Sequence, residues 1–168
     1  MVFTFRRKAA RVVLLDREGR VLLLRARDPA DQSKPPWWEI PGGGMEWGET
    51  SADAARRELR EETGLTEVEI GPCVWVQHAD FDFGGYHFDQ DEWIHVAWSD
   101  GGDVAPDGLE ALEAVAFHGW RWWALDDLLA STDPLLPAQL RDLLPPLVSG
   151  RLPASPIDIG GGAALVDP

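Results

Sequence analysis

The chain has 168 residues and a formal net charge of −14 at pH 7, and hydrophobic residues make up 45% of it. This length and apolar content fit one folded domain with a substantial core. The acidic balance argues against a nucleic-acid polymer or an anionic membrane surface as a partner. The single cysteine, Cys73, excludes an internal disulfide and a cysteine zinc cluster.

The sequence contains no visible targeting or membrane-spanning segment. Residues 1–8 lack the apolar stretch of a signal peptide. No apolar run approaches the ~18 residues that a membrane span requires. We therefore expect a cytoplasmic protein without a membrane partner, and the sequence leaves a homodimer open.

Apolar runs bounded by turn residues alternate with helical patterns along the chain. In chain order we expect a hairpin of two strands at residues 9–15 and 20–26, followed by a helix at residues 51–63. Two further strands are expected at residues 68–79 and 92–98, and a last β-prone stretch at residues 114–124. Two short helices at residues 125–130 and 137–148 complete the pattern. Residues 81–91 and 99–108, which contain glycines and acidic side chains, are expected to be loops. From Gly150 onward, proline, glycine and small residues predict a tail.

The helix expected at residues 51–63 has clear signals at both ends. Thr50 or Ser51 is a good N-cap residue. Gly64 stands where a helix ends in a left-handed conformation. Three glycines precede this segment at residues 42–44, and they allow unusual backbone angles and close approach of a metal or phosphate.

Three carboxylates share one face of this helix. At about 100° per residue, Glu58, Glu61 and Glu62 fall within an arc of about 100°. Like charges at this spacing repel each other, and the negative end of the helix dipole adds to the cost. Mg²⁺ and Mn²⁺ are hard cations that prefer oxygen ligands, so a divalent ion would relieve both effects.

The segment from Gly43 to Leu65 has a fixed spacing of glycine, glutamate and arginine. Gly43 is followed after five residues by Glu49, and after seven more by the string RELREETGL. This pattern resembles the Nudix box, G-x5-E-x7-R-E-U-x-E-E-x-G-U, in which U is a bulky aliphatic residue, and every fixed position matches. The resemblance implies the α/β Nudix fold, a mixed β-sheet sandwiched between α-helices (α/β/α). We expect this domain at residues 5–148, and a poorly ordered C-terminal tail at residues 149–168.

The resemblance also implies a reaction class, the metal-dependent hydrolysis of the diphosphate linkage in a nucleoside diphosphate derivative. A water activated by Mg²⁺ or Mn²⁺ would attack phosphorus in a small-molecule nucleotide. The residues that the resemblance implies as metal ligands are the Gly42 carbonyl and the side chains of Glu58, Glu61 and Glu62. The expected catalytic residues are Glu58, Arg57, Glu49 and Glu92.

The residues of this set have different expected roles. Arg57 would hold the carboxylates in place by ion pairing, through Glu49. For the general base, the Nudix branches offer either the first glutamate of the box helix, here Glu58, or an acid from a distant segment. Glu92 and the loop acids Glu110 and Glu113 are the distant candidates, which the sequence leaves open.

Aromatic residues near the motif offer candidate surfaces for stacking a nucleobase, although aromatic residues in strands usually belong to the core. The candidates are Trp37, Trp38, Trp47, Phe81, Phe83, Tyr86 and Phe88. The layout resembles broad bacterial Nudix hydrolases of nucleoside di- or triphosphates. An ADP-ribose or nucleotide-sugar pyrophosphatase is an alternative, but the ADP-ribose branch often has a proline some 15 residues past the box and none stands there. A nucleotide sensor without turnover is the other alternative, and the intact box glutamates favour an enzyme.

Overall fold

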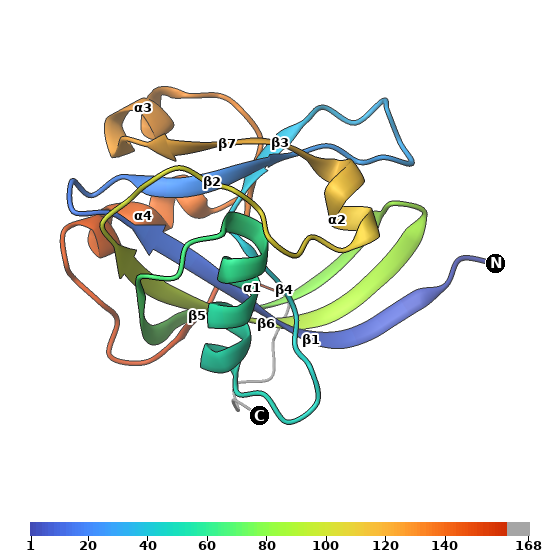
Figure 1. The fold of residues 1–168 in the computed structure, drawn as a ribbon, viewed down its shortest axis with the longest axis horizontal. Coiled ribbons are helices and arrows are strands. Elements are labelled where there is room, and N and C mark those ends of the chain that lie inside the picture. Colours follow the sequence, from blue (N-terminus) through green and yellow to red (C-terminus); the bar gives the residue numbers. More distant parts are fainter. Residues whose placement is uncertain (161–168) are drawn as a thin grey trace.

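The computed structural model describes residues 1–160, and within them a mixed β-sheet forms the centre of the fold (Figure 1). The strands are β1 (Thr4–Leu15), β2 (Val21–Ala26), β3 (Trp37–Glu39), β4 (Gly42–Gly44), β5 (Val68–Phe83), β6 (Tyr86–Ser99), β7 (Phe117–Trp123), β8 (Leu135–Leu136) and β9 (Ile157–Asp158). The helices are α1 (Ser51–Thr63), α2 (Ala111–Ala116), α3 (Leu125–Ala130) and α4 (Leu140–Val148). The main strand order is β8-β3-β2-β1-β6-β5-β9, with β4 paired to β1 and β7 paired to β2.

Strand β1 is central because its two faces pack into two different apolar clusters. Successive side chains of a strand point to opposite faces. Val12 and Leu14 lie in one cluster with Leu59 of α1. Val13 lies in the other cluster, to which α4 contributes Leu144. Helices therefore cover both faces of the sheet, as the α/β prediction requires.

Strands β5 and β6 form a long antiparallel hairpin, and β1 runs parallel to β6 along it. The prediction of a loop at residues 81–91 is wrong, because β5 continues to Phe83 and β6 begins at Tyr86. Only Gly84 and Gly85 form the turn, with φ values of 62° and 84° that suit glycine. In Figure 1 the end of this hairpin and the first residues of β1 extend away from α1.

The C-terminal part of the sheet differs from the expectation in two places. The stretch 114–124 is not entirely β, because α2 ends at Ala116 and only then does β7 begin. Helix α4 begins at Leu140 rather than at residue 137. The predicted helix at residues 125–130 is confirmed as α3.

Within the predicted tail, β9 pairs in parallel with β5. Residues 161–168 lie outside the described residues, so the boundary at residue 148 and the order of the tail stay predictions. No helix in residues 1–160 is long and apolar enough to cross a membrane.

Candidate active site

Helix α1 is fixed at both ends by local contacts, and the prediction of a helix at residues 51–63 is confirmed. The Thr50 side chain accepts a hydrogen bond from the Asp53 N–H, and Gly64 ends the helix with a φ of 73°. The Ser51 Oγ lies 2.7 Å from His95 Nε2 of β6. The first turn of α1 is therefore tied to the sheet, which orients the acidic face of the helix.

Three glutamates from two helices meet at one place. Glu58 and Glu62 lie one turn apart on α1, and Glu113 comes from α2. One carboxylate oxygen from each of the three lies within 4.8 Å of those from the other two. Glu58 and Glu62 are buried and Glu113 is partly buried. No other such group of His, Cys, Asp or Glu side chains occurs among the residues that the structure describes.

Burial raises the pKa of all three carboxyl groups. The pKa of Glu58 rises to about 7, because burial outweighs the attraction of Arg57. Burial and the nearby Glu58 hold the pKa of Glu62 well above its usual range, against the hydrogen bond from the Gly42 N–H. Burial also raises the pKa of Glu113. Ionising such a group of buried carboxylates needs added positive charge. A hard divalent cation with oxygen ligands fits this donor set.

The glycines of β4 allow the backbone to lie directly against these carboxylates. The Gly42 N–H donates a 2.6 Å hydrogen bond to Glu62 Oε2. A Cβ atom on Gly43 would lie 2.8 Å from Glu58 Oε2, so a side chain at this position would displace the Glu58 carboxylate. Gly42 itself has a φ of 143° and abuts β1. The Gly42 carbonyl as a metal ligand stays a prediction.

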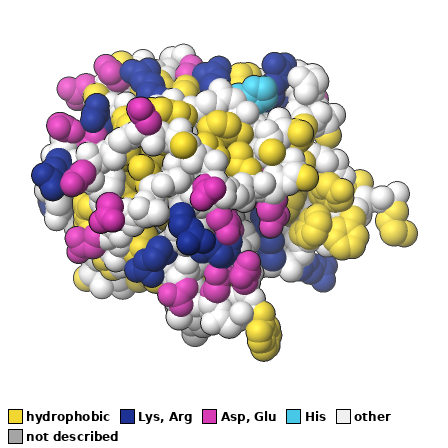
Figure 2. Space-filling model, viewed as in Figure 1, with side chains coloured by type: hydrophobic (Ala, Val, Ile, Leu, Met, Phe, Trp, Pro, Cys, Tyr) yellow, Lys and Arg dark blue, Asp and Glu magenta, His cyan; other side chains and the backbone are white. Residues whose placement is uncertain are grey.

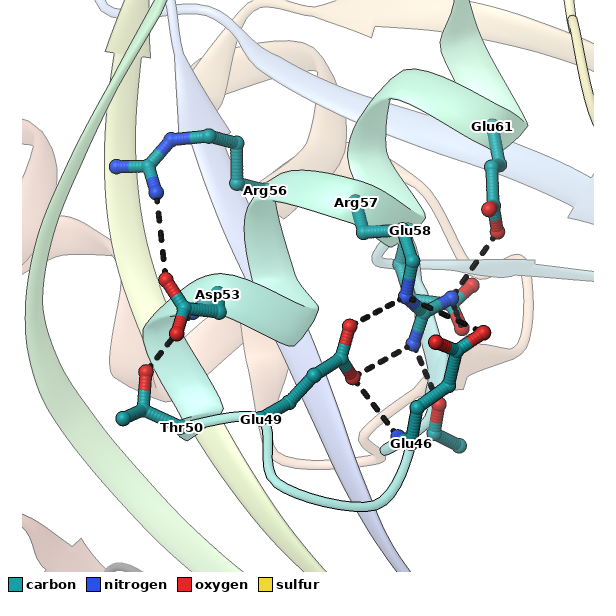
Figure 3. A network of polar contacts seen from close by, with 9 residues as sticks. Glu46, Glu49, Thr50, Asp53, Arg56, Arg57, Glu58 and Glu61 are labelled. Atoms are coloured by element: carbon teal, nitrogen blue, oxygen red, sulfur yellow. Dashed lines mark hydrogen bonds and ion pairs between the residues drawn. The ribbon is translucent and has the colours of Figure 1, made fainter.

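Arg57 lies at the centre of a network of acidic side chains (Figure 3). Its Nε and Nη2 donate to the two oxygens of Glu49 at 2.6 and 3.0 Å. Its Nη1 donates to Glu58 Oε1 at 2.8 Å, and its Nη2 also reaches the Gly44 carbonyl. The expected pairing of Arg57 with Glu49 is present, and this pairing connects the loop before α1 to Glu58.

Glu61 occupies a different position from the other box glutamates. Its Oε2 accepts a hydrogen bond from Arg57 Nη1 at 3.1 Å, and its side chain is 29% exposed. Its stem lies against Gly108 in the loop before α2. Glu61 is not in the group formed by Glu58, Glu62 and Glu113. Its role as a metal ligand therefore stays a prediction, because Glu61 does not share the group that the other two glutamates form.

Glu92 lies in a closed polar network on β6. It accepts hydrogen bonds from Arg11, Gln77 and Gln90, and its side chain is 2% exposed. Although burial would raise the pKa of Glu92, Arg11 and these hydrogen bonds lower it. A carboxylate held in this way is a weak proton acceptor, and Glu92 lies outside the three-glutamate group.

A cavity of about 870 Å³ adjoins the three-glutamate group and extends along the β5–β6 hairpin. Its lining includes Glu62 and Glu113 and four cationic residues, Arg7, Arg11, Arg25 and Lys34. The aromatic residues of the lining are Phe5, Trp37, Phe81, Phe83, Tyr86, Phe88 and Phe117. Of the other aromatic candidates, Trp38 is buried in the core and Trp47 is fully exposed. Figure 2 shows apolar side chains gathered at the right of the molecule, on the side where the chain begins. Phe3, Phe5 and Tyr86 are exposed, and the ring of Phe5 contacts the other two rings edge to face.

Comparisons with known proteins agree with this geometry. Residues 5–145 match the family model of the NUDIX domain. An RNA pyrophosphohydrolase of Caulobacter vibrioides (strain NA1000 / CB15N) is 36% identical over 130 residues, covering 69% of this chain and 70% of the relative. A MutT NUDIX hydrolase from Burkholderia pseudomallei has a similar structure, with a TM-score of 0.51 and 25% identity over 78% of this chain and 90% of that one. The E. coli dihydroneopterin triphosphate pyrophosphohydrolase shares the fold, with a TM-score of 0.60 and 16% identity over 89% of this chain and 99% of that one. The chain therefore belongs to the Nudix hydrolase family.

Proposed function

We propose that this pyrophosphohydrolase cleaves the diphosphate linkage of a nucleotide with the help of a divalent cation. The convergence of Glu58, Glu62 and Glu113 beside a cavity that Glu62 and Glu113 line carries the proposal. A water oxygen attacks one phosphorus, and the bond from that phosphorus to the bridging oxygen breaks. The elements of water are thereby divided between the two phosphate products.

The residues of the chain would have distinct roles at such a site. When bound, Mg²⁺ or Mn²⁺ supplies Lewis-acid neutralisation of phosphate charge and acidifies water. Glu58 and Glu62 would hold the cation, with the Gly42 carbonyl as a further ligand. Arg57 and Glu49 would keep Glu58 in place through their hydrogen bonds.

Two carboxylates are suitably placed to accept the proton of the attacking water. Glu58 and Glu113 have raised pKa values, and each belongs to the group beside the cavity. Glu92 is a poorer candidate because three side chains occupy its oxygens. We assign Glu92 a supporting role, in which it holds Arg11, Gln77 and Gln90 in the sheet beside the cavity.

A small nucleotide is the substrate that the cavity favours. Its volume of about 870 Å³ lies within the range of small-molecule sites. Aromatic side chains at the hairpin end offer contacts for a base or sugar. The formal net charge of −14 disfavours long contacts with a polyanion. We therefore place nucleoside di- or triphosphates first, and the cytoplasmic location and a homodimer stay predictions.

The 5′ end of an RNA is the second candidate. The observation in its favour is the 36% identity to a relative named RNA pyrophosphohydrolase. Only the terminal nucleotide would need to enter the cavity, with the rest of the chain outside. ADP-ribose, nucleotide sugars and binding without turnover are the remaining alternatives.

A substrate panel with Mg²⁺, Mn²⁺ or chelator tests the proposal. It should include nucleoside di- and triphosphates, oxidised nucleotides, ADP-ribose, nucleotide sugars, dinucleoside polyphosphates and a short 5′-triphosphorylated RNA. Phosphate, pyrophosphate and monophosphate release are measured separately. We expect metal-dependent cleavage of a mononucleotide. Preference for the RNA would select the second candidate, and no turnover on any compound would contradict an enzymatic function.

A further inference from the structure

Arg7 lies on the face of β1 that meets the cavity. Phe5, Arg7, Ala9 and Arg11 alternate along this strand, so they share one face of the sheet. Phe5, Arg7 and Arg11 line the cavity. Arg7 pairs in register with Gln90 of β6. The sequence motif alone gives no reason to single out this residue.

Two contacts fix the direction of the Arg7 side chain. Its Nε donates a 2.8 Å hydrogen bond to Gln90 Oε1. Its guanidinium carbon lies 4.8 Å from the centre of the Phe88 ring, in a cation–π arrangement. Gln90 is 1% exposed and donates its own amide N–H to Glu92. A buried network therefore holds the near side of the guanidinium.

The far side of the same guanidinium makes no such contacts. Within residues 1–160, Arg7 forms no ion pair with a carboxylate, and its Nη1 and Nη2 donate no hydrogen bond. The other nearby arginines differ, because Arg11 is paired with Glu92 and Arg57 with Glu49. Arg7 thus presents two terminal nitrogens, in the planar fork that suits phosphate oxygens.

The position of these nitrogens relates Arg7 to the acidic group. A Cβ atom on Gly44 would lie 2.8 Å from Arg7 Nη1, and one on the adjacent Gly43 would lie 2.8 Å from Glu58 Oε2. Burial and the neighbouring Arg11 lower the pKa of Arg7, whereas Glu58, Glu113 and Glu92 raise it. Arg7 is thus an exposed cation at the wall of the cavity, within electrostatic range of these carboxylates but without an ion pair to them in residues 1–160.

We propose that Arg7 binds a phosphate group of the substrate, with Phe88 and Gln90 as the residues that position its guanidinium. This inference rests on the proposed function, since it assumes a phosphorylated ligand in the cavity. The anion would occupy Nη1 and Nη2 and compensate both Arg7 and its like-charged neighbour Arg11. The acidic group and Arg7 would then contact the same diphosphate from two sides.

The test compares Arg7→Ala and Arg7→Lys with Arg6→Ala. Arg6 is the matched control, because it is the preceding residue of β1, points to the opposite face and is 82% exposed in its pair with Asp89. Binding of inorganic pyrophosphate and of ATP is measured by calorimetry in chelator, so that cation binding does not contribute. We expect Arg7→Ala to weaken both affinities about 10- to 100-fold, the scale of a lost hydrogen bond to a charged group. Arg7→Lys should lose less, and Arg6→Ala should bind like the wild type.

A competing explanation is that Arg7 only offsets the charge of the carboxylates. In that case Arg7→Ala would tighten Mg²⁺ binding and leave pyrophosphate and ATP affinity unchanged, a result that overturns the proposal. Thermal unfolding shows whether Arg7→Ala is folded, and Arg7→Lys repeats the comparison with the charge retained. Absence of turnover in the wild-type protein would contradict the proposed function while leaving the pyrophosphate-binding test intact.

Discussion

Arg57 and Glu49 form a bidentate ion pair, in which Arg57 Nε lies 2.6 Å from Glu49 Oε1 and Arg57 Nη2 lies 3.0 Å from Glu49 Oε2. The two residues are eight positions apart, one on α1 and one in the loop before it. Both side chains are less than one-fifth exposed. Since Arg57 also donates to Glu58, the pair fixes a carboxylate of the candidate metal site through a single guanidinium.

The first prediction concerns this pair. Arg57→Lys retains the charge but loses the planar fork, so it should lower the rate of hydrolysis about 10- to 100-fold. Glu49→Gln should have an effect of similar size. Arg56→Lys is the control, because Arg56 is exposed and, within the described part of the chain, its one ion pair is with Asp53 at 3.8 Å. Equal rates for the Arg56 and Arg57 variants would contradict the role given to the pair.

A second prediction concerns Glu113, and the control is Glu110, its partner in the capping box of α2. Its Oε2 accepts a hydrogen bond from the Glu110 N–H, and the Glu110 side chain caps the same helix in return. If Glu113 accepts the proton, Glu113→Gln should lower kcat about 10²- to 10⁴-fold. Glu110→Gln disturbs the same cap without touching the carboxylate group, so its kcat should remain near that of the wild type. Similar losses in both variants would mean that the cap, rather than proton transfer, explains the effect.

The third prediction concerns the stability of the metal-free protein. Burial raises the pKa of Glu58 from 4.5 to about 7, so the folded state holds a proton that the unfolded state releases. The resulting stability is fully present below about pH 4.5 and is lost as the pH rises through about 7, a contribution on the order of 3 kcal/mol. Denaturant unfolding in chelator should therefore show Glu58→Gln gaining stability relative to the wild type between pH 5 and pH 8. A difference that does not change with pH would contradict the raised pKa.

The two histidines of the β5–β6 hairpin, His78 and His87, give a fourth prediction. His78 lies between Asp91 and Asp89, and His87 lies between Asp82 and Asp80. The main causes that raise the pKa of His78 and His87 above 6.5 are the hydrogen bonds that these imidazoles donate to the carboxylates of Asp91 and Asp82. Stability from these pairs is present below pH 6.5 and is lost as the pH rises through the raised values.

Nuclear magnetic resonance titration of the imidazole protons checks this directly. Asp82→Asn should lower the pKa of His87 and leave that of His78 unchanged, and Asp91→Asn should do the reverse. Two histidines that titrate at or below 6.5 in the wild-type protein would contradict the arrangement of these pairs.

The motif allowed much of the site to be predicted from the sequence, because its contacts are local in the chain. Helix α1, its caps and the pairing of Arg57 with Glu49 follow from spacing within one short segment. Glu113 could be proposed only as one of several acids, because its place beside Glu58 depends on the long connection through β5 and β6. Helical spacing predicts Glu61 on the same face as Glu58 and Glu62. It does not predict that the Glu61 side chain accepts a hydrogen bond from Arg57 and lies outside the three-glutamate group.

The hairpin end was missed although the sequence carries a signal for it. Phe81, Phe83, Tyr86 and Phe88 alternate with polar residues on either side of Gly84-Gly85. This period of two around a diglycine turn is typical of a β-hairpin. The number of glycines and acidic residues suggested a loop instead. For the same reason Arg7 was missed, because its position opposite Gln90 and near Phe88 depends on the pairing of β1 with β6.

The proposed site requires a divalent cation, held by Glu62 and its neighbours, for hydrolysis. The most direct measurement is Mn²⁺ binding by electron paramagnetic resonance together with the initial rate of nucleotide hydrolysis, in the wild type, Glu62→Gln and Glu61→Gln. We expect Glu62→Gln to lose Mn²⁺ affinity and to lower the rate at least about 100-fold, with a much smaller effect of Glu61→Gln. Unchanged Mn²⁺ binding and an unchanged rate in Glu62→Gln would contradict the proposed site.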